Sequence, residues 1–176
     1  MSYFMVDVET DGPIPGEYSM IRLGAVLVRE PLSAAPTFLG SLRPVSEHYD
    51  LEALKVTSLT REDTLLFDNP MDVMIRFRDW VGGKNVGKRA MFISDNNGFD
   101  FMFVHWYMCR FFGSDPFGYS STNLGSLYKG LVKDTFQTFK HLRVTDHTHN
   151  PVDDAMGNAE ALVYMKNNLG LKILLE

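Results

Sequence analysis

Hydrophobic and polar positions along the chain follow two different periods, one typical of strands and one typical of helices. The expected strands are residues 3–9, 20–29, 37–43 and 89–94. Helical spacing is found over residues 51–59, 71–80 and 99–112. The last of these runs is apolar nearly all round, which predicts a buried helix. Three early strands joined by Gly- and Pro-containing loops predict a meander, and the later helices and strand predict an α/β layer fold with a mixed sheet.

A clearer helix is expected to begin after residue 150. Asn150 is a good N-cap, Pro151 suits the first helical position, and Asp153 and Asp154 complement the positive end of the helix dipole. The apolar face of this helix consists of Val152, Ala155, Ala159 and Leu162. Gly170 is the expected stop.

Length and composition fit a single globular domain over residues 1–176, because 176 residues with 45% apolar content can bury one sizeable core. No segment approaches the ~18 apolar residues of a membrane span, and the first residues do not resemble a secretion signal. We therefore expect a soluble protein with no membrane partner. Cys109, the one cysteine of the sequence, lies in an apolar run and favours a reducing, cytoplasmic location.

The net charge of −5 argues against a broad basic surface that coats duplex nucleic acid. It does not exclude a nuclease, because carboxylates that bind divalent cations also make a sequence acidic. Residues 123–149 are locally basic, with aromatic residues between the cations. This stretch could follow the backbone of a single strand, or it could be a solvated helix face.

The first candidate chemistry is a pair of acids at the end of the first strand. Strand alternation puts Asp7 and Glu9 on the same face, where two like charges repel. A cation shared between them would remove both the repulsion and the cost of burial. The alternative is that the strand runs out into solvent and both acids are hydrated.

Two further clusters carry acids at helix starts. Asp100 lies among phenylalanines, where it could cap the helix through the dipole or join a site. His149 precedes the last helix, and Asp154 lies in its first turn, five positions on, so an imidazole and a carboxylate could face one cavity. Each cluster taken alone also has a purely structural explanation.

The three clusters together resemble the motifs of the DEDDh exonucleases, in the same order. DVET at 7–10 is similar to the family's D-x-E-T, DNNGFDFMF at 95–103 to H-N-x-x-F-D-x-x-F, and HNPVDDA at 149–155 to H-x-A-x-x-D-A. LEALKVTSLTRED at 51–63 resembles a segment that these enzymes often carry between the first two motifs. The resemblance covers about residues 3 to 166. Asp95 and Pro151 depart from the family's usual His and Ala, which blurs the subfamily but leaves the acids intact.

The resemblance implies an RNase H-like fold, a mixed five-stranded sheet with helices around it, and 3′→5′ hydrolysis of phosphodiester bonds that releases nucleoside monophosphates. It also implies two Mg²⁺ or Mn²⁺ ions, the hard cations that oxygen ligands select. The implied metal ligands are Asp7, Glu9, Asp100 and Asp154. His149 would be the general base that accepts a proton from the attacking water.

Substrate contacts are implied by the same resemblance. The nucleic-acid partner would be bound at its 3′ end, with Ile14 and Tyr18 placed to wedge or stack against the last bases. The other substrate-binding candidates are Thr10, Asp11, Gly12, Asn96 and Phe103. Whether the substrate is DNA or RNA is left open, and so is a homodimer. The alternatives are a non-catalytic nucleic-acid-binding module, which would have lost an acid or the histidine, and an RNase H-like endonuclease, which would lack His149.

Overall fold

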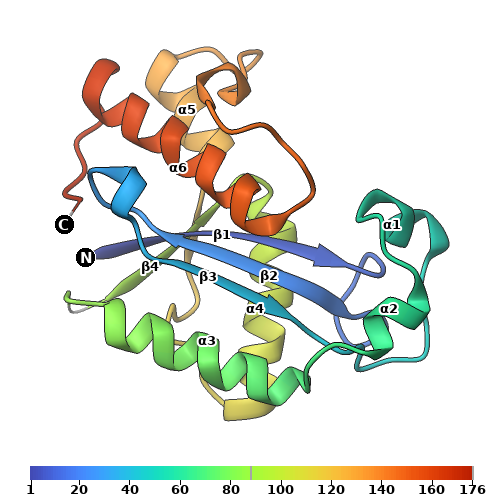
Figure 1. Cartoon of the computed structure of the whole chain (residues 1–176). Coiled ribbons are helices and arrows are strands. Elements are labelled where there is room, and N and C mark those ends of the chain that lie inside the picture. The colour runs from blue at the N-terminus through green and yellow to red at the C-terminus, as the bar shows by residue number, and fades with distance from the viewer. Residues whose placement is uncertain (88, 176) are drawn as a thin grey trace.

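One sheet of five strands forms the centre of the molecule, and helices cover both of its faces (Figure 1). The computed structural model describes residues 1–87 and 89–175. In sheet order β3-β2-β1-β4-β5, the strands are β1 (Ser2–Thr10), β2 (Met20–Leu27), β3 (Thr37–Ser41), β4 (Ala90–Ser94) and β5 (Ser121–Asn123). The first three form an antiparallel meander, whereas β4 is parallel to β1 and β5 is parallel to β4. The predicted meander and mixed sheet are confirmed.

The described residues form six α-helices, all of which follow the meander in the sequence. They are α1 (Leu51–Val56), α2 (Arg61–Leu65), α3 (Pro70–Lys84), α4 (Asn97–Phe112), α5 (Leu124–Val132) and α6 (Pro151–Asn168). Short 3-10 turns lie at η1 (Leu32–Ala34) and η2 (Lys140–Leu142). The helix expected over residues 51–59 ends at Val56, because Ser58 has a positive φ of 56° and Thr60 starts α2 with a capping box. Among the described residues, no helix is long and apolar enough to cross a membrane.

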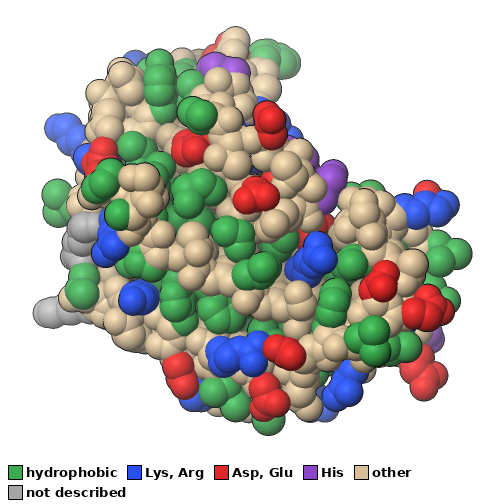
Figure 2. Space-filling view, in the orientation of Figure 1, with side chains coloured by type: hydrophobic (Ala, Val, Ile, Leu, Met, Phe, Trp, Pro, Cys, Tyr) green, Lys and Arg blue, Asp and Glu red, His purple; other side chains and the backbone are tan. Residues whose placement is uncertain are grey.

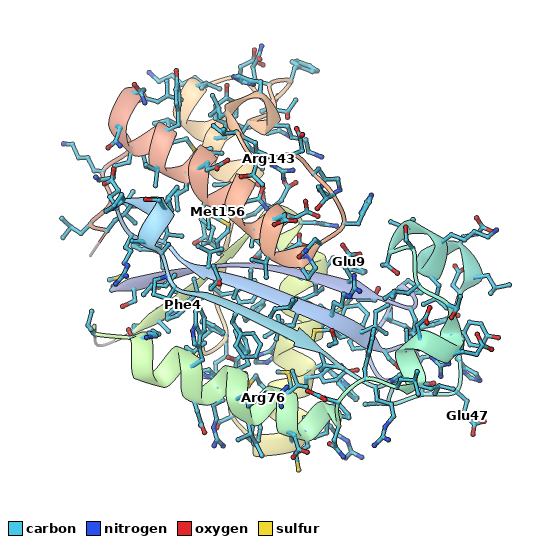
Figure 3. All side chains as sticks on the ribbon, viewed as in Figure 1. Phe4, Glu9, Glu47, Arg76, Arg143 and Met156 are labelled. Carbon is cyan, nitrogen blue, oxygen red and sulfur yellow. The ribbon has the colours of Figure 1, made fainter. Side chains whose placement is uncertain are left out.

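The alternation of β1 separates two hydrophobic cores. Phe4, Val6 and Val8 point to the core under α3 and α4, whereas Met5 points to the core under α5 and α6. Figure 3 shows the same division, with Phe4 on the α3 side of the sheet and Glu9 near the start of α6. The odd-numbered residues that follow Met5 along the strand therefore face α6.

Helix α4 is less buried than its composition predicted. Phe103, Val104, Tyr107 and Met108 pack into the core, but Met102 is 36% exposed and Arg110 is also exposed. An apolar composition does not by itself report burial, because a helix on one face of a sheet always has an outer side. The predicted buried helix is therefore buried on the side that faces the core and exposed on its outer side.

Helix α6 begins as its sequence predicts and lies directly on the sheet. The Asn150 side chain accepts a hydrogen bond from the Val152 N–H at 3.1 Å, and Pro151 takes the first helical position. Gly24 of β2 makes this close approach possible, because a Cβ at that position would lie 2.3 Å from the Pro151 carbonyl carbon. Gly24 is paired with Asp7 across the sheet, so α6 starts immediately above Asp7.

Candidate active site

Carboxylates from β1 and α6 meet where the end of the strand passes under the start of the helix. One oxygen each of Asp7, Glu9 and Asp154 lie within 4.8 Å of one another. Asp7 and Glu9 share the strand face that turns toward α6, and Asp154 lies in the first turn of that helix. The alternative in which the strand runs out into solvent is wrong, since the Glu9 side chain is only 12% exposed.

Asp100 reaches the same place from the opposite side of β1. The β1–β4 ladder ends at the pair Met5 and Ile93, so it leaves the Val8 N–H without a partner strand on that edge. Asp100 accepts this N–H at 3.3 Å and is only 3% exposed. A buried N–H needs such a partner. Asp100 is therefore tied to the strand between Asp7 and Glu9, and helix capping alone does not explain it.

Asp154 has one satisfied and one unsatisfied oxygen. Its Oδ1 accepts the Thr148 N–H at 3.0 Å and lies 2.8 Å from Nδ1 of His147. Its Oδ2 is buried, and no hydrogen-bond partner is found for it among the described residues. Leaving a buried carboxylate oxygen unpaired is costly, which makes this atom a natural ligand for a cation.

The loop before α6 brings two histidines to the cluster. His149 has a φ of 58°, uncommon for a side chain of its size, and its Nδ1 lies 3.9 Å from the Glu9 carboxylate. The His147 ring packs edge-on against the His149 ring with centroids 4.4 Å apart. His147 was not identified from the sequence, although its position two residues before His149 in an extended loop could have suggested it. Figure 2 shows histidine and acidic side chains near the indentation between the α6 region and α1.

The cluster is electrostatically strained without a counter-ion. Burial raises the pKa of Asp7 well above its usual range, and the charges of Asp100, Glu9 and Asp154 raise it further. Burial, followed by the charges of Asp154 and Asp100, raises the pKa of Glu9 to about 8. Burial also raises the pKa of Asp100 to about 7. Divalent cations would relieve this repulsion, and the oxygen-only donors of the four acids fit a hard ion.

A basic side chain from the locally basic stretch 123–149 borders the acids. Arg143 donates to Asp95 at 3.2 Å and to the buried Asn158 of α6, and its side chain is 9% exposed (Figure 3). Its charge opposes the rise in the pKa of Asp7. Asp95 stands where the second motif of the family usually has histidine. Through its contact with Arg143, it links the β4–α4 connection to α6. This link joins residues 48 positions apart, so no local motif could indicate it.

Two of the substrate-binding candidates line a groove beside the acids. Its lining residues are Thr10, Gly12, Pro13, Asp50, Glu52, Ala53, Val56 and Phe99. Thr10 follows Glu9 on the chain and Phe99 precedes Asp100, so the groove adjoins the carboxylate cluster. Ile14 is 46% exposed and Asn96 is also exposed, but neither is part of this lining.

Two other candidates have structural contacts instead. The Asp11 side chain is fully buried, accepts the Ser19 N–H and pairs with Arg61 at 2.7 Å. Phe103 is also fully buried and packs against the Phe99 ring at 5.0 Å. Neither side chain has exposed surface in the unbound chain, so the expected contacts of substrate with the backbone at Asp11 and with Phe103 stay predictions. Tyr18 covers Gly12 so closely that a Cβ at position 12 would overlap its ring.

Comparison with known proteins agrees with this geometry. No family model matches the chain. It is 30% identical over 167 residues to the 3′-5′ DNA exonuclease Cap18 of Escherichia coli, and the match covers 90% of this chain and 88% of that protein. The nuclease domain of 3′hExo, a DEDDh family member solved with bound rAMP, has a TM-score of 0.76 at 20% identity and covers 99% of this chain and 96% of that one. Exonuclease I of E. coli in complex with a dT13 oligonucleotide has a TM-score of 0.74 at 15% identity, covering 94% of this chain and 41% of that one.

The fold and the clustered acids define an RNase H-like phosphodiester hydrolase. The chain belongs to the DEDDh family of 3′→5′ exonucleases, which are metal-dependent nucleases. The non-catalytic module is not favoured, and neither is the endonuclease.

Proposed function

We propose that Asp7, Glu9, Asp100 and Asp154 hold two Mg²⁺ or Mn²⁺ ions and that this site removes nucleotides from the 3′ end of single-stranded DNA. The observation that carries the proposal is the convergence of buried and partly buried acids around an unsatisfied Asp154 oxygen. Four acids from two strand positions and two helices would repel one another in a purely structural role. A donor set made of oxygen atoms favours Mg²⁺ or Mn²⁺ over softer metals.

In this proposal the four acids hold the cations in place, and His149 moves the proton. When bound, the two cations would lower the pKa of the attacking water and stabilise the charge on the leaving 3′ oxygen. Asp7, on the strand between Asp100 and Asp154, is the acid placed to serve both cations. His149 is half exposed and borders Glu9, so its ring can take a proton from a water in the site and pass it to solvent.

The choice of single-stranded DNA as substrate is supported by the groove beside the acids and by the similarity to Cap18. Cap18 is described as a DNA exonuclease, and this supports DNA over RNA for the present chain. The groove beside the acids has an apolar wall of Ala53, Val56 and Phe99, suited to the faces of unpaired bases. Thr10 and Gly12 would present the backbone to the terminal nucleotide. A reducing, cytoplasmic setting is also part of the proposal, supported by the free Cys109.

The test is a time course with matched DNA and RNA oligonucleotides labelled at either the 3′ or the 5′ end. We expect the 3′ label to leave as a mononucleotide at the first time point and the 5′ label to shorten stepwise. Single-stranded DNA should be degraded faster than RNA of the same sequence. Mg²⁺ or Mn²⁺ should support the reaction and EDTA should stop it.

Each part of the proposal can fail separately in this assay. Internal cuts or early release of the 5′ label would contradict the 3′→5′ assignment. Faster loss of RNA would overturn the choice of DNA but leave the direction intact. Cleavage that persists in EDTA would contradict the metal site.

A further inference from the structure

His147 forms a second cluster with two residues of the proposed active site. Its Nδ1 lies 2.8 Å from Asp154 Oδ1, and its ring centroid lies 4.4 Å from that of His149. One ligand atom each of His147, His149 and Asp154 lie within 4.8 Å of one another. The two imidazoles extend from an exposed loop, whereas Asp154 is 1% exposed, so the cluster opens to solvent on one side only.

The donor chemistry of this cluster differs from that of the four acids. Two imidazoles and one carboxylate suit a borderline ion such as Zn²⁺, which binds histidine nitrogen and carboxylate oxygen at ~2.0 to 2.2 Å. Around a tetrahedral ion with these bond lengths, neighbouring ligand atoms lie about 3.3 Å apart. The atoms here start within 4.8 Å, so small side-chain rotations would close the site. The unpartnered Asp154 Oδ2 offers a further oxygen toward a cation.

The loop that carries the two histidines is anchored rather than free. The N–H groups of Val144 and Thr145 both donate to Glu160 of α6 at 2.7 Å. Thr148 donates to Asp154 from its backbone and to Asp153 from its hydroxyl, at 3.0 and 3.2 Å. An anchored loop loses little entropy when an ion binds, which favours a built site over a chance encounter of surface histidines.

We propose that His147, His149 and Asp154 form an inhibitory site for Zn²⁺. A zinc ion in this site would bind the imidazole of His149, the proposed general base, and the carboxylate of Asp154, a proposed ligand of the Mg²⁺ or Mn²⁺ ions. Zinc would thus stop hydrolysis while magnesium is still present. The inhibition rests on the proposed function, whereas zinc binding at this cluster does not.

The binding test compares zinc titrations of metal-free wild type, His147→Ala and His48→Ala by calorimetry. His48 is an exposed histidine outside the cluster and controls for the loss of an imidazole. We expect His147→Ala to bind zinc more than about 100-fold more weakly, because a residue that only orients a ligand costs ~10 to 100-fold. His48→Ala should bind zinc as wild type does. A loss of less than about tenfold in His147→Ala would overturn the site.

Asp7→Asn separates this site from the main cluster. Asp7 is not among the three zinc ligands, so this variant should keep tight zinc binding even though it loses the proposed magnesium ligand. If Asp7→Asn and His147→Ala lose zinc equally, zinc binds the four-acid cluster and the proposal is wrong. Because this arm measures binding alone, its outcome does not depend on nuclease activity.

The inhibition test measures the ratio of rates with and without zinc at fixed Mg²⁺, so that any change in the basal rate of a variant cancels. Wild type and His48→Ala should share one zinc concentration for half inhibition, and His147→Ala should need at least about ten times more. Equal sensitivity of all three, together with the expected binding result, would overturn the inhibitory role. Absence of any nuclease activity would instead refute the proposed function and leave the binding result standing.

Discussion

His149 differs from the four acids because it contributes no carboxylate to the cluster, and mutagenesis can use this difference. His149→Ala should reduce the single-turnover rate by ~10² to 10⁴-fold, the usual cost of removing a general base. Its Mg²⁺ affinity should be preserved, since all four acids remain. Magnesium titration and rates measured in the same buffer would check both expectations. A rate near that of wild type would contradict the proton-transfer role.

The acids of the site could be predicted from the sequence, but the burial and contacts of the residues next to them could not. Asp7 and Glu9 follow from strand alternation, and Asp154 follows from a helix start that Asn150 marks clearly. Asp11 looked like part of the same motif, yet it pairs with Arg61, fifty positions away. Burial of this kind depends on which distant segment folds over a residue, and a local pattern holds no information about it.

At the scale of elements, the site depends on how closely α6 lies on the sheet. Gly24→Ala would put a Cβ 2.3 Å from the Pro151 backbone, so the start of α6 must move. We expect a loss of ~1 to 3 kcal/mol in the free energy of unfolding, as for other overpacked contacts. The displacement of Asp154 should also lower the cleavage rate, because a shift of ~1 Å can cost about 10²-fold. Denaturant unfolding and rate measurements would check the two effects.

Gly82→Ala is the matched control for this prediction. Gly82 lies near the end of α3, is not one of the site residues, and a Cβ there meets only open space. Alanine in a helix interior should stabilise the protein by ~0.5 to 1 kcal/mol and leave the cleavage rate unchanged. Equal stability and activity in Gly24→Ala and wild type would show that α6 can be displaced without effect.

Elements with a clear local signature were predicted, including the five-residue strand β4, but β5 and α5 were not. The meander and α6 have clear periodicity, caps and turn residues. Strand β5 has only three residues, too few for its period to be recognised, and α5 follows it directly without a turn between them. The position of β5 beside β4 comes from parallel pairing with Phe92 to Ser94, a contact made only in the folded chain.

At the scale of the whole molecule, the acids should make the metal-free protein less stable as pH rises. The pKa of Glu9 is about 8 in the folded protein and near 4.5 in its usual range, and that of Asp100 is about 7. Between about pH 4.5 and pH 8 the folded state holds protons that the unfolded chain has released, so the free energy of unfolding falls as pH increases. In EDTA we expect the melting temperature to be at least about 3 °C lower at pH 8.5 than at pH 5.5.

Added Mg²⁺ should remove most of this difference, because the bound cations replace the protons that neutralise the cluster. Glu9→Gln should show a flatter dependence on pH in EDTA than wild type. Thermal unfolding by circular dichroism at both pH values is the measurement. A metal-free protein that becomes more stable toward pH 8.5 would contradict the assigned electrostatics.

The most direct test of the central claim is a comparison of Asp7→Asn with Asp72→Asn. Both changes remove one carboxylate charge, but Asp72 lies exposed on α3 and Asp7 lies in the cluster. Mn²⁺ binding by calorimetry and single-turnover cleavage of a 3′-labelled DNA strand would be measured for both variants in one buffer. We expect Asp72→Asn to match wild type and Asp7→Asn to lose metal binding and cleavage together. Intact metal binding and turnover in Asp7→Asn would contradict the assignment of the four acids as the metal site of this exonuclease.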